Sequence, residues 1–354
     1  MISIDKLLSQ YQPLNPEASR QFDQIRGFSA ASVVFCHAYL LFLYPIWPAA
    51  MLPIYLTAHA CVMALFALSG FLICQSACHN IQKYKQFNVK QYTRARINRI
   101  VPPLYFACIV LVMLYWLSPS VFATGNREFK IISETISQAN MSLHLKDLLG
   151  VLFFMNGFIT ETPASNFAFW SLSFEAWFYI LFGILLLPNR SMSILFSLVG
   201  LVILSTLNYI FLLYVCIWLA GAIAALLYQQ RYHLNKKQII FIIMIFTIML
   251  GFLYTIQVSP LAIYGTWIGI ILAILLYLIA TQKVKIWLPC YFIAKTSYTI
   301  YLLHFPILLF IYGVIQPYIY HNVMLLIFST LSAATLSIII GIICGKRIEN
   351  IQIL

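Results

Sequence analysis

The chain has 354 residues, of which 62% are hydrophobic and only 8% are charged, and its mean hydropathy is +0.91. A soluble domain carries about 25% charged residues, so this composition excludes an ordinary soluble protein and leaves little length for a separate soluble domain. The formal net charge of +12 would suggest nucleic acid as the partner of a soluble chain. In a membrane protein it is typical of cytoplasmic loops rich in Lys and Arg, so we expect no nucleic-acid partner.

Apolar runs long enough to cross a bilayer follow one another along the chain and predict about ten transmembrane helices. The expected spans are about residues 27–47, 52–78, 100–117, 170–187, 192–207, 210–228, 238–256, 261–280, 291–312 and 322–344. The basic stretch NVKQYTRARINRI before the third span predicts a separate helix in the membrane interface. Pro102 and Pro103 are then expected in the first turn of that span, where proline is tolerated. The predicted fold is an all-α, polytopic transmembrane helix bundle forming one domain, 1–354, without a cleavable signal peptide.

The distribution of positive charge predicts the orientation of this bundle. The lead-in, the loops after the second, fourth, sixth and eighth spans, Lys295 and the tail hold 18 of the 21 Lys and Arg residues, whereas the other faces hold Arg127, Lys130 and Lys146. Cytoplasmic loops carry the excess of Lys and Arg. We therefore expect residues 1–26 and 345–354, and so both termini, in the cytoplasm, and residues 118–169 in an external loop.

Eight cysteines occur, and nearly all of them lie inside apolar runs. No CxxC pair and no secreted disulfide framework is present. We expect free thiols and no metal site.

The stretch QIRGFSAASVVFCHAYL contains the first candidate for chemistry. Ten residues separate Arg26 from His37, which on a helix is about 16 Å of rise, roughly half the hydrocarbon thickness of a bilayer. If Arg26 lies at one face, His37 lies near the midplane, where an ionisable residue points to a functional site. His37 has a reference pKa near neutrality and could act as a general base on a hydroxyl; alternatively, it is a core histidine bonded to a backbone carbonyl.

Glu175 is the acid that falls within a predicted span, near the outer end of the fourth. It could snorkel to the interface as an anchor. As a functional group it would bind an acceptor or orient His37 from a polar cavity.

Two further groups are candidates, the first at a depth similar to that of His37 and the second at the cytoplasmic mouth of the third span. Ser69 and Gly70, in FALSGFLIC, permit close approach of a ligand or of another helix. Arg94, Arg96 and Arg99 gather at the mouth of the third span, where arginine can grip phosphate bidentately. They form either a site for a phosphorylated cytosolic donor or an anchor for lipid head groups.

A polar stripe runs along the ninth predicted span, in SYTIYLLHFPIL. Spacings of three and four place Ser297, Tyr301 and His304 on one helix face, and Tyr298 lies beside them. A polar stripe on an apolar helix should face the interior of the bundle, either as a site or for packing alone.

Together these stretches resemble the acyltransferase-3 family of integral membrane acyltransferases. IRGFSAASVVFCH is similar to the first-helix pattern of that family, an arginine, ten residues and a histidine, although Phe28 stands where a small aliphatic residue is commoner. FALSGFLI, RARINRIVPPLYF, FWSLSFEAWFYILFG and SYTIYLLHFPIL resemble its later motifs. The five motifs occur in chain order from Arg26 to Pro306.

The resemblance implies transfer of an acyl group, usually acetyl, from acyl-CoA to a sugar hydroxyl in the inner membrane of a bacterium. The implied acceptor is an envelope polysaccharide, a glycolipid or other lipid-linked saccharide, or a periplasmic glycan. Acetyl-CoA would be a co-substrate, and membrane lipid would surround the enzyme. The implied catalytic residues are His37 and Glu175. The donor-side residues are Arg26, Arg94, Arg96, Arg99, Ser69 and Gly70, and the acceptor-side residues are Trp170, Ser173, Tyr298, Tyr301 and His304.

Three other classes compete with this interpretation. A transporter or flippase of lipid-linked saccharides would predict paired halves with broken helices, and the sequence contains no internal repeat. A purely structural membrane protein would not need His37, Glu175 and His304 in its spans. Membrane-bound acyltransferases that act on lipids or proteins would share a histidine but not these motifs.

Overall fold

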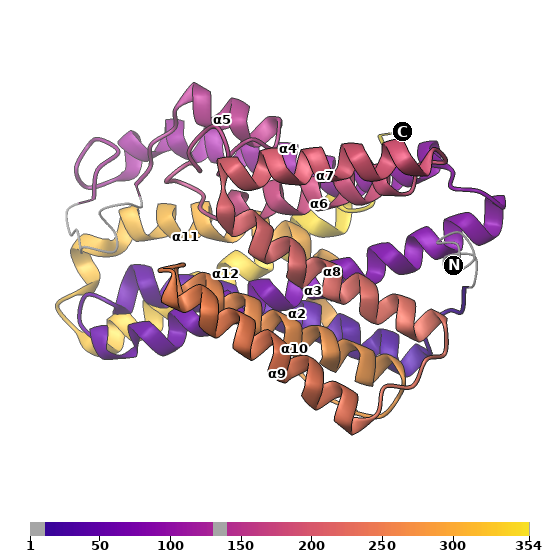
Figure 1. Cartoon of the computed structure of the whole chain (residues 1–354). Coiled ribbons are helices and arrows are strands. Elements are labelled where there is room, and N and C mark those ends of the chain that lie inside the picture. Colours follow the sequence, from indigo (N-terminus) through magenta and orange to yellow (C-terminus); the bar gives the residue numbers. More distant parts are fainter. Residues whose placement is uncertain (1–10, 130–139, 354) are drawn as a thin grey trace. The chain divides into compact units, whose positions relative to one another are not determined.

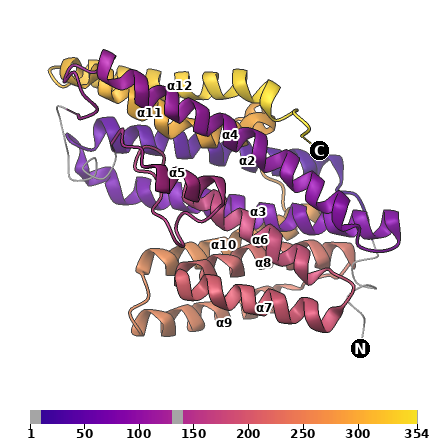
Figure 2. The ribbon, with the colours of Figure 1, turned by 90° about the horizontal axis from the view of Figure 1, so that it is seen from above.

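A computed structural model describes residues 11–129 and 140–353 of the chain. The first ten residues of the predicted lead-in and Lys130 lie outside this range. Across the described residues the protein is helical, with no strand and one isolated bridge between Asn156 and Thr160 (Figures 1 and 2). The prediction of an all-α fold is confirmed.

Within residues 11–129 and 140–353, ten helices correspond to the ten predicted spans. Nine are long and apolar enough to cross a membrane, and the tenth, α6, is apolar but has 17 residues. The helices are α2 (Pro16–Ala38), α3 (Met51–Tyr84), α4 (Val89–Val121), α5 (Leu145–Leu152), α6 (Phe169–Leu185), α7 (Arg190–Leu207), α8 (Tyr209–Gln229), α9 (Lys236–Thr255), α10 (Pro260–Ala280), α11 (Ser297–Ile319) and α12 (Val323–Ile348). Short helical segments are η1 (Tyr39–Leu43, a π-helix), η2 (Pro48–Ala50) and η3 (Tyr291–Thr296).

The surfaces of α7 and α9 are those of membrane helices. Only 11% of the apolar window of α7 and 6% of that of α9 is buried within the protein. Exposed side chains on α9 include Phe241, Ile248 and Phe252. Soluble proteins rarely expose apolar patches of this kind, whereas the hydrocarbon of a bilayer covers them, so the chain is an integral membrane protein.

Helix α2 begins at Pro16, well before the predicted start at residue 27. The side chain of Asn15 accepts a hydrogen bond from the N–H of Glu17 (2.8 Å), and proline follows Asn15 at the first helical position, where its missing N–H costs nothing. The helix therefore starts in the polar lead-in and carries Arg26 in its interior.

Helix α4 corrects the predicted interface helix. Asn88 caps its first turn by accepting from the N–H of Gln91 (3.0 Å), and one helix continues through the basic stretch to Val121. Pro102 and Pro103 thus lie in the helix interior and not in a first turn. The basic stretch is already helical before the apolar part begins, so no new helix has to start at the prolines.

The described chain forms two compact units, each discontinuous in sequence. Unit 1 contains the chain up to Arg26, His59–Arg96 and Trp177–Tyr291; unit 2 contains Gly27–Ala58, Ile97–Ala176 and the chain from Phe292 onward. Helices α2, α3, α4 and α6 each contribute to both units. The prediction of one domain stays a prediction, and the units are described separately below.

In unit 1, glycine allows α3 and α8 to approach closely. A Cβ on Gly70 would lie 1.9 Å from the carbonyl oxygen of Trp218, and one on Gly221 would lie 2.0 Å from that of Ala67. Small residues that let backbones meet are the usual contact between membrane helices. Helix α10 packs against α8 and α9 (Figure 2).

In unit 2, α11 packs along α12 (Figures 1 and 2), and both contact the π-helical segment η1. A Cβ on Gly341 would lie 2.6 Å from the Ile300 side chain, so glycine again sets the helix spacing. Almost the whole of α11 is buried between Ser297 and Leu309. This buried helix carries the predicted polar stripe.

Candidate functional site

Two histidines from distant parts of the sequence meet in unit 2. Nδ1 of His37, in the last turn of α2, lies 2.9 Å from Nε2 of His304 on α11. The two rings are stacked at 27° with their centroids 5.1 Å apart, and the ring of Phe305 meets His37 edge-on. His304 has no exposed surface, whereas His37 is half-buried, so His37 is the more accessible residue of the pair.

The other ring nitrogen of His304 is held by its own helix. Nδ1 lies 2.6 Å from the carbonyl oxygen of Tyr301. Both nitrogens of His304 therefore have partners, one on the backbone and one on His37.

The helix changes to a wider form two residues after His37. Residues Tyr39–Leu43 form a π-helix, a rare geometry that is frequent at functional sites. The carbonyl of Phe42 within it accepts from the hydroxyl of Tyr320 (3.1 Å), and the hydroxyl of Tyr39 donates to the carbonyl of Trp47 (2.5 Å). These contacts hold the segment that follows the histidine.

Pro306 leaves one backbone carbonyl of α11 without its helical hydrogen-bond donor, and a residue of a loop supplies the donor instead. Proline has no N–H, so the carbonyl four residues earlier, that of Leu302, loses its helical donor. The side-chain amide of Asn166 donates to that carbonyl at 2.9 Å, while the Asn166 oxygen accepts from the N–H of Ala168. Asn166 is completely buried, and it ties the segment before α6 to the turn of α11 that carries His304.

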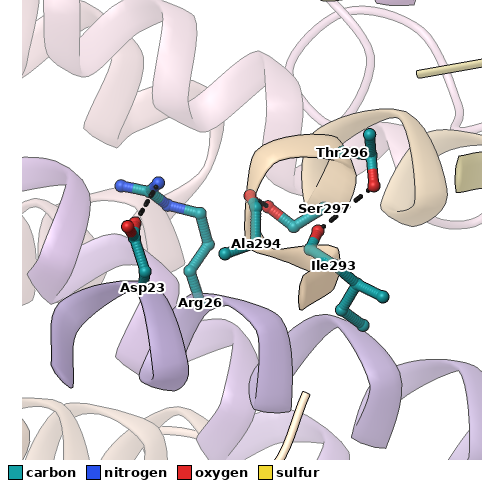
Figure 3. A network of polar contacts seen from close by, with 6 residues as sticks. All are labelled: Asp23, Arg26, Ile293, Ala294, Thr296 and Ser297. Atoms are coloured by element: carbon teal, nitrogen blue, oxygen red, sulfur yellow. Dashed lines mark hydrogen bonds and ion pairs between the residues drawn. The ribbon is translucent and has the colours of Figure 1, made fainter. Parts of the chain in front are cut away.

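A second polar contact joins α6 to α11. The hydroxyls of Ser171 and Tyr301 are 2.8 Å apart, and Ser171 also donates to the carbonyl of Ala168 (3.1 Å). Since Ser171 uses its proton on that carbonyl, the Tyr301 hydroxyl is the donor to Ser171. As predicted, the stripe of Ser297, Tyr301 and His304 is buried, and Ser297 donates to the carbonyl of Ala294 at 2.8 Å (Figure 3).

The remaining predicted acceptor residues of α6 lie nearby in the same unit. The hydroxyl of Ser173 donates to the side-chain oxygen of Asn156, and the ring of Trp170 packs edge-on against Phe174. Glu175 is partly exposed and lies close enough to Tyr301 to interact electrostatically with its phenol. Tyr298 is also partly exposed.

The predicted donor residues fall mainly in unit 1. Arg26 forms an ion pair with Asp23, one turn earlier on α2, at 3.0 Å (Figure 3). The guanidinium of Arg96 donates to the hydroxyl of Ser76 (3.2 Å) and lies over the rings of Tyr92 and Tyr179. Arg94 is exposed, and so is Arg99, which belongs to unit 2.

Ser69 and Gly70 make the contacts of helix packing. The Ser69 hydroxyl lies 2.9 Å from that of Tyr179 and accepts from the indole N–H of Trp218 (3.3 Å). Gly70 faces the backbone of Trp218. Of the two interpretations left open by the sequence, close approach of another helix describes this geometry.

Asn166, Ser171 and Asn156 were not predicted from the sequence, although each touches a predicted residue or its helix. The proline two residues after His304 was a usable signal, because it implies a donor for Leu302. Nothing in the sequence identified Asn166 as that donor, 136 positions away.

All eight cysteines are free thiols, as predicted. No disulfide constrains either unit.

These features define a class: a polytopic helical membrane protein with a pair of hydrogen-bonded histidines in its apolar helices, one half-buried and one fully buried. The sequence model of the acyltransferase-3 family, described as an acyltransferase domain, matches residues 19–343. The chain belongs to this family, and the family implies membrane acyltransferase activity. No curated protein and no solved structure matched the chain.

Proposed function

We propose that this acyltransferase moves an acyl group, in particular acetyl, from cytosolic acyl-CoA to a sugar hydroxyl of an envelope polysaccharide or glycolipid. The observation that carries the proposal is the histidine pair, in which His37 is partly exposed and hydrogen-bonded to the buried His304. A histidine held by a second group is the arrangement that general base catalysis requires.

The proposed step balances without a metal or redox partner. The acceptor O–H bond breaks and its proton moves to a ring nitrogen of His37. The oxygen forms a bond to the thioester carbon, and the carbon–sulfur bond to CoA breaks. The proton then passes from His37 to the leaving thiolate, which regenerates the neutral base.

Arginines are the proposed donor-binding groups. CoA carries phosphates, which guanidinium groups bind through charge-assisted hydrogen bonds. Arg96 is the best-positioned candidate, because Ser76 and two tyrosine rings orient it. Arg26 and Arg94, also in unit 1, and Arg99, in unit 2, are the other proposed donor-binding residues.

The acceptor side is proposed for the polar and aromatic side chains of α6 and α11, some of them half-buried. Ser173, Tyr298, Tyr301 and Trp170 supply hydroxyls and a ring of the kind that sugars bind, and the Glu175 carboxylate interacts electrostatically with Tyr301. Because the donor is cytosolic and glycan precursors cross the inner membrane, we propose that this bacterial membrane is the site of the reaction.

The test is transfer of label by purified protein in liposomes. Radiolabelled acetyl-CoA and candidate envelope glycans are supplied, and labelled glycan is expected with the parent. His37→Gln keeps polarity but cannot act as a base near neutrality, so its rate should fall by about 10²–10⁴-fold, the usual contribution of a positioned base.

The matched control is His59→Gln. His59 is another histidine within a span, bonded to the hydroxyl of Tyr214 at 3.0 Å in unit 1, and its replacement should leave transfer at the parent rate. Near-normal turnover by His37→Gln would refute the base. Unmodified glycan crossing the bilayer, with no labelled product, would favour a flippase instead.

A further inference from the structure

The hydrogen bonds around His304 fix the position of its ring hydrogen. A carbonyl oxygen only accepts, so Nδ1 of His304, 2.6 Å from the Tyr301 carbonyl, is a donor and carries the hydrogen. A neutral imidazole has one N–H. Nε2 of His304 is therefore an acceptor.

The same argument then fixes His37. Its Nδ1 lies 2.9 Å from the acceptor Nε2 of His304, so Nδ1 of His37 carries the hydrogen. Nε2 of a neutral His37 then carries no hydrogen and keeps its lone pair. His37 as a residue is half-buried, whereas His304 is fully buried.

We infer that His304 is a positioning residue that holds His37 in the tautomer whose Nε2 is the base, a role that rests on the proposed function. His304 touches neither donor nor acceptor in this role, in contrast to the acceptor contact expected from the sequence. Its full burial and its two occupied ring nitrogens are what such a role requires.

The geometry also provides for the charge that develops on His37. When Nε2 takes the proton of the acceptor hydroxyl, His37 becomes an imidazolium. Its Nδ1–H bond to the neutral His304 then becomes charge-assisted, and such bonds are roughly twice as strong as neutral ones. The interaction is stronger in the transition state than in the ground state, which is the condition for it to accelerate the reaction.

Contacts to the backbone and side chains of α11 hold the two histidines in position. Tyr301, whose carbonyl fixes the His304 hydrogen, is anchored by its hydroxyl to Ser171. The next carbonyl, that of Leu302, is held by Asn166. The stacking of His37 on His304 and the edge of Phe305 leave the His37 ring little room to turn over.

The tautomer can be measured without any substrate. Protein labelled with ¹⁵N-histidine is placed in liposomes, and solid-state NMR distinguishes protonated from unprotonated ring nitrogens; signals missing from the His37→Gln spectrum belong to His37. The expected result is a protonated Nδ1 and an unprotonated Nε2. The opposite tautomer would overturn the proposal even if the protein is an active transferase.

Two variants test the consequence for catalysis. His304→Leu removes the acceptor and should lower kcat about 10²-fold while leaving KM for acetyl-CoA unchanged. His304→Gln places an amide oxygen where Nε2 lies, and it should recover at least about a tenth of the parent kcat together with the parent tautomer.

The matched control is His59→Leu, which removes a histidine from a comparable contact with Tyr214 and should leave kcat and the His37 spectrum unchanged. Parent kcat in His304→Leu would refute the proposal. If His304→Leu does not fold, the parent spectrum and His304→Gln still decide it. Absence of transfer by the parent itself would count against the proposed function and not against the tautomer.

Discussion

The side chain of Arg96 is held by neighbouring residues, whereas that of Arg94 is exposed. Both lie in the basic first half of α4, but Arg94 is exposed, whereas Arg96 donates to Ser76 and lies 5.5 Å from the ring centroid of Tyr92 and 5.8 Å from that of Tyr179. A guanidinium with a fixed plane can present its remaining N–H groups to a phosphate with little further loss of entropy.

We therefore predict that Arg96→Ala weakens acetyl-CoA binding by about tenfold or more, since a hydrogen bond to a charged group contributes about 1.5–3 kcal/mol and 1.4 kcal/mol is tenfold. Arg96→Lys should recover part of the loss because it keeps the charge without the fork. Binding is measured by calorimetry on protein in detergent. Lys90→Ala, which removes an exposed charge from the same helix, is the control, and donor affinity in Arg96→Ala equal to that of Lys90→Ala would show that Arg96 does not bind the donor.

Single residues were predictable where their chemistry conflicts with their surroundings. His37 and His304 were identified because an ionisable side chain in an apolar span is costly. Their pairing was not predictable, since 267 positions separate them and either could equally have been bonded to a carbonyl. Ser69 and Gly70 illustrate the limit, because small residues suit a ligand and a helix contact equally well.

At the scale of the helix, α11 depends on a side chain from outside it. Pro306 removes the N–H that would bind the Leu302 carbonyl, and Asn166 supplies the replacement donor. His304 lies between Leu302 and Pro306 on α11. Its position therefore depends on the contact of Leu302 with Asn166, in the loop before α6.

We predict that Asn166→Ala lowers both thermal stability and transfer, because a buried carbonyl left without a donor costs about 1–3 kcal/mol. Pro306→Ala would return an N–H to the helix, so the penalty of Asn166→Ala should be smaller in the Pro306→Ala background. The melting temperatures of the four proteins in detergent form the required double-mutant cycle.

Asn140→Ala is the control for that cycle, since Asn140 is an exposed loop asparagine that accepts from the N–H of Ser142. It should change neither melting temperature nor transfer. Equal penalties for Asn166→Ala with and without Pro306 would mean that Asn166 does not act through the open carbonyl.

The helices themselves were largely predictable, because a run of about 20 apolar residues has few alternatives in a membrane. Their starts were not. Helices α2 and α4 begin in polar segments that were assigned to a lead-in and to an interface helix, and the missed signals were Asn15 before Pro16 and Asn88 before Val89. Capping residues, rather than hydropathy, determine where these helices begin.

At the scale of the whole molecule, hydropathy predicts how many helices there are but not how they group. Four helices contribute to both compact units, so neither unit corresponds to a continuous stretch of sequence. Contacts such as His37 with His304 in unit 2, or Ser69 with Tyr179 in unit 1, depend on this grouping. Periodicity within one helix carries no information about its partner helix.

Orientation in the membrane is the property of the whole chain that the sequence predicts most directly. Eighteen of the 21 Lys and Arg residues fall on the side that would be cytoplasmic, with both termini on that side. The proposed chemistry needs this orientation, because acyl-CoA is cytosolic and phosphates reach Arg96 only if the basic end of α4 faces the cytoplasm.

We predict that green fluorescent protein fused after Leu354 fluoresces and that alkaline phosphatase fused there is inactive. Phosphatase fused after Gly125, in the predicted external loop, should be active. An active phosphatase after Leu354 would show that the C-terminus is external. The basic end of α4 would then face away from cytosolic acyl-CoA, and the arginines could not bind this donor.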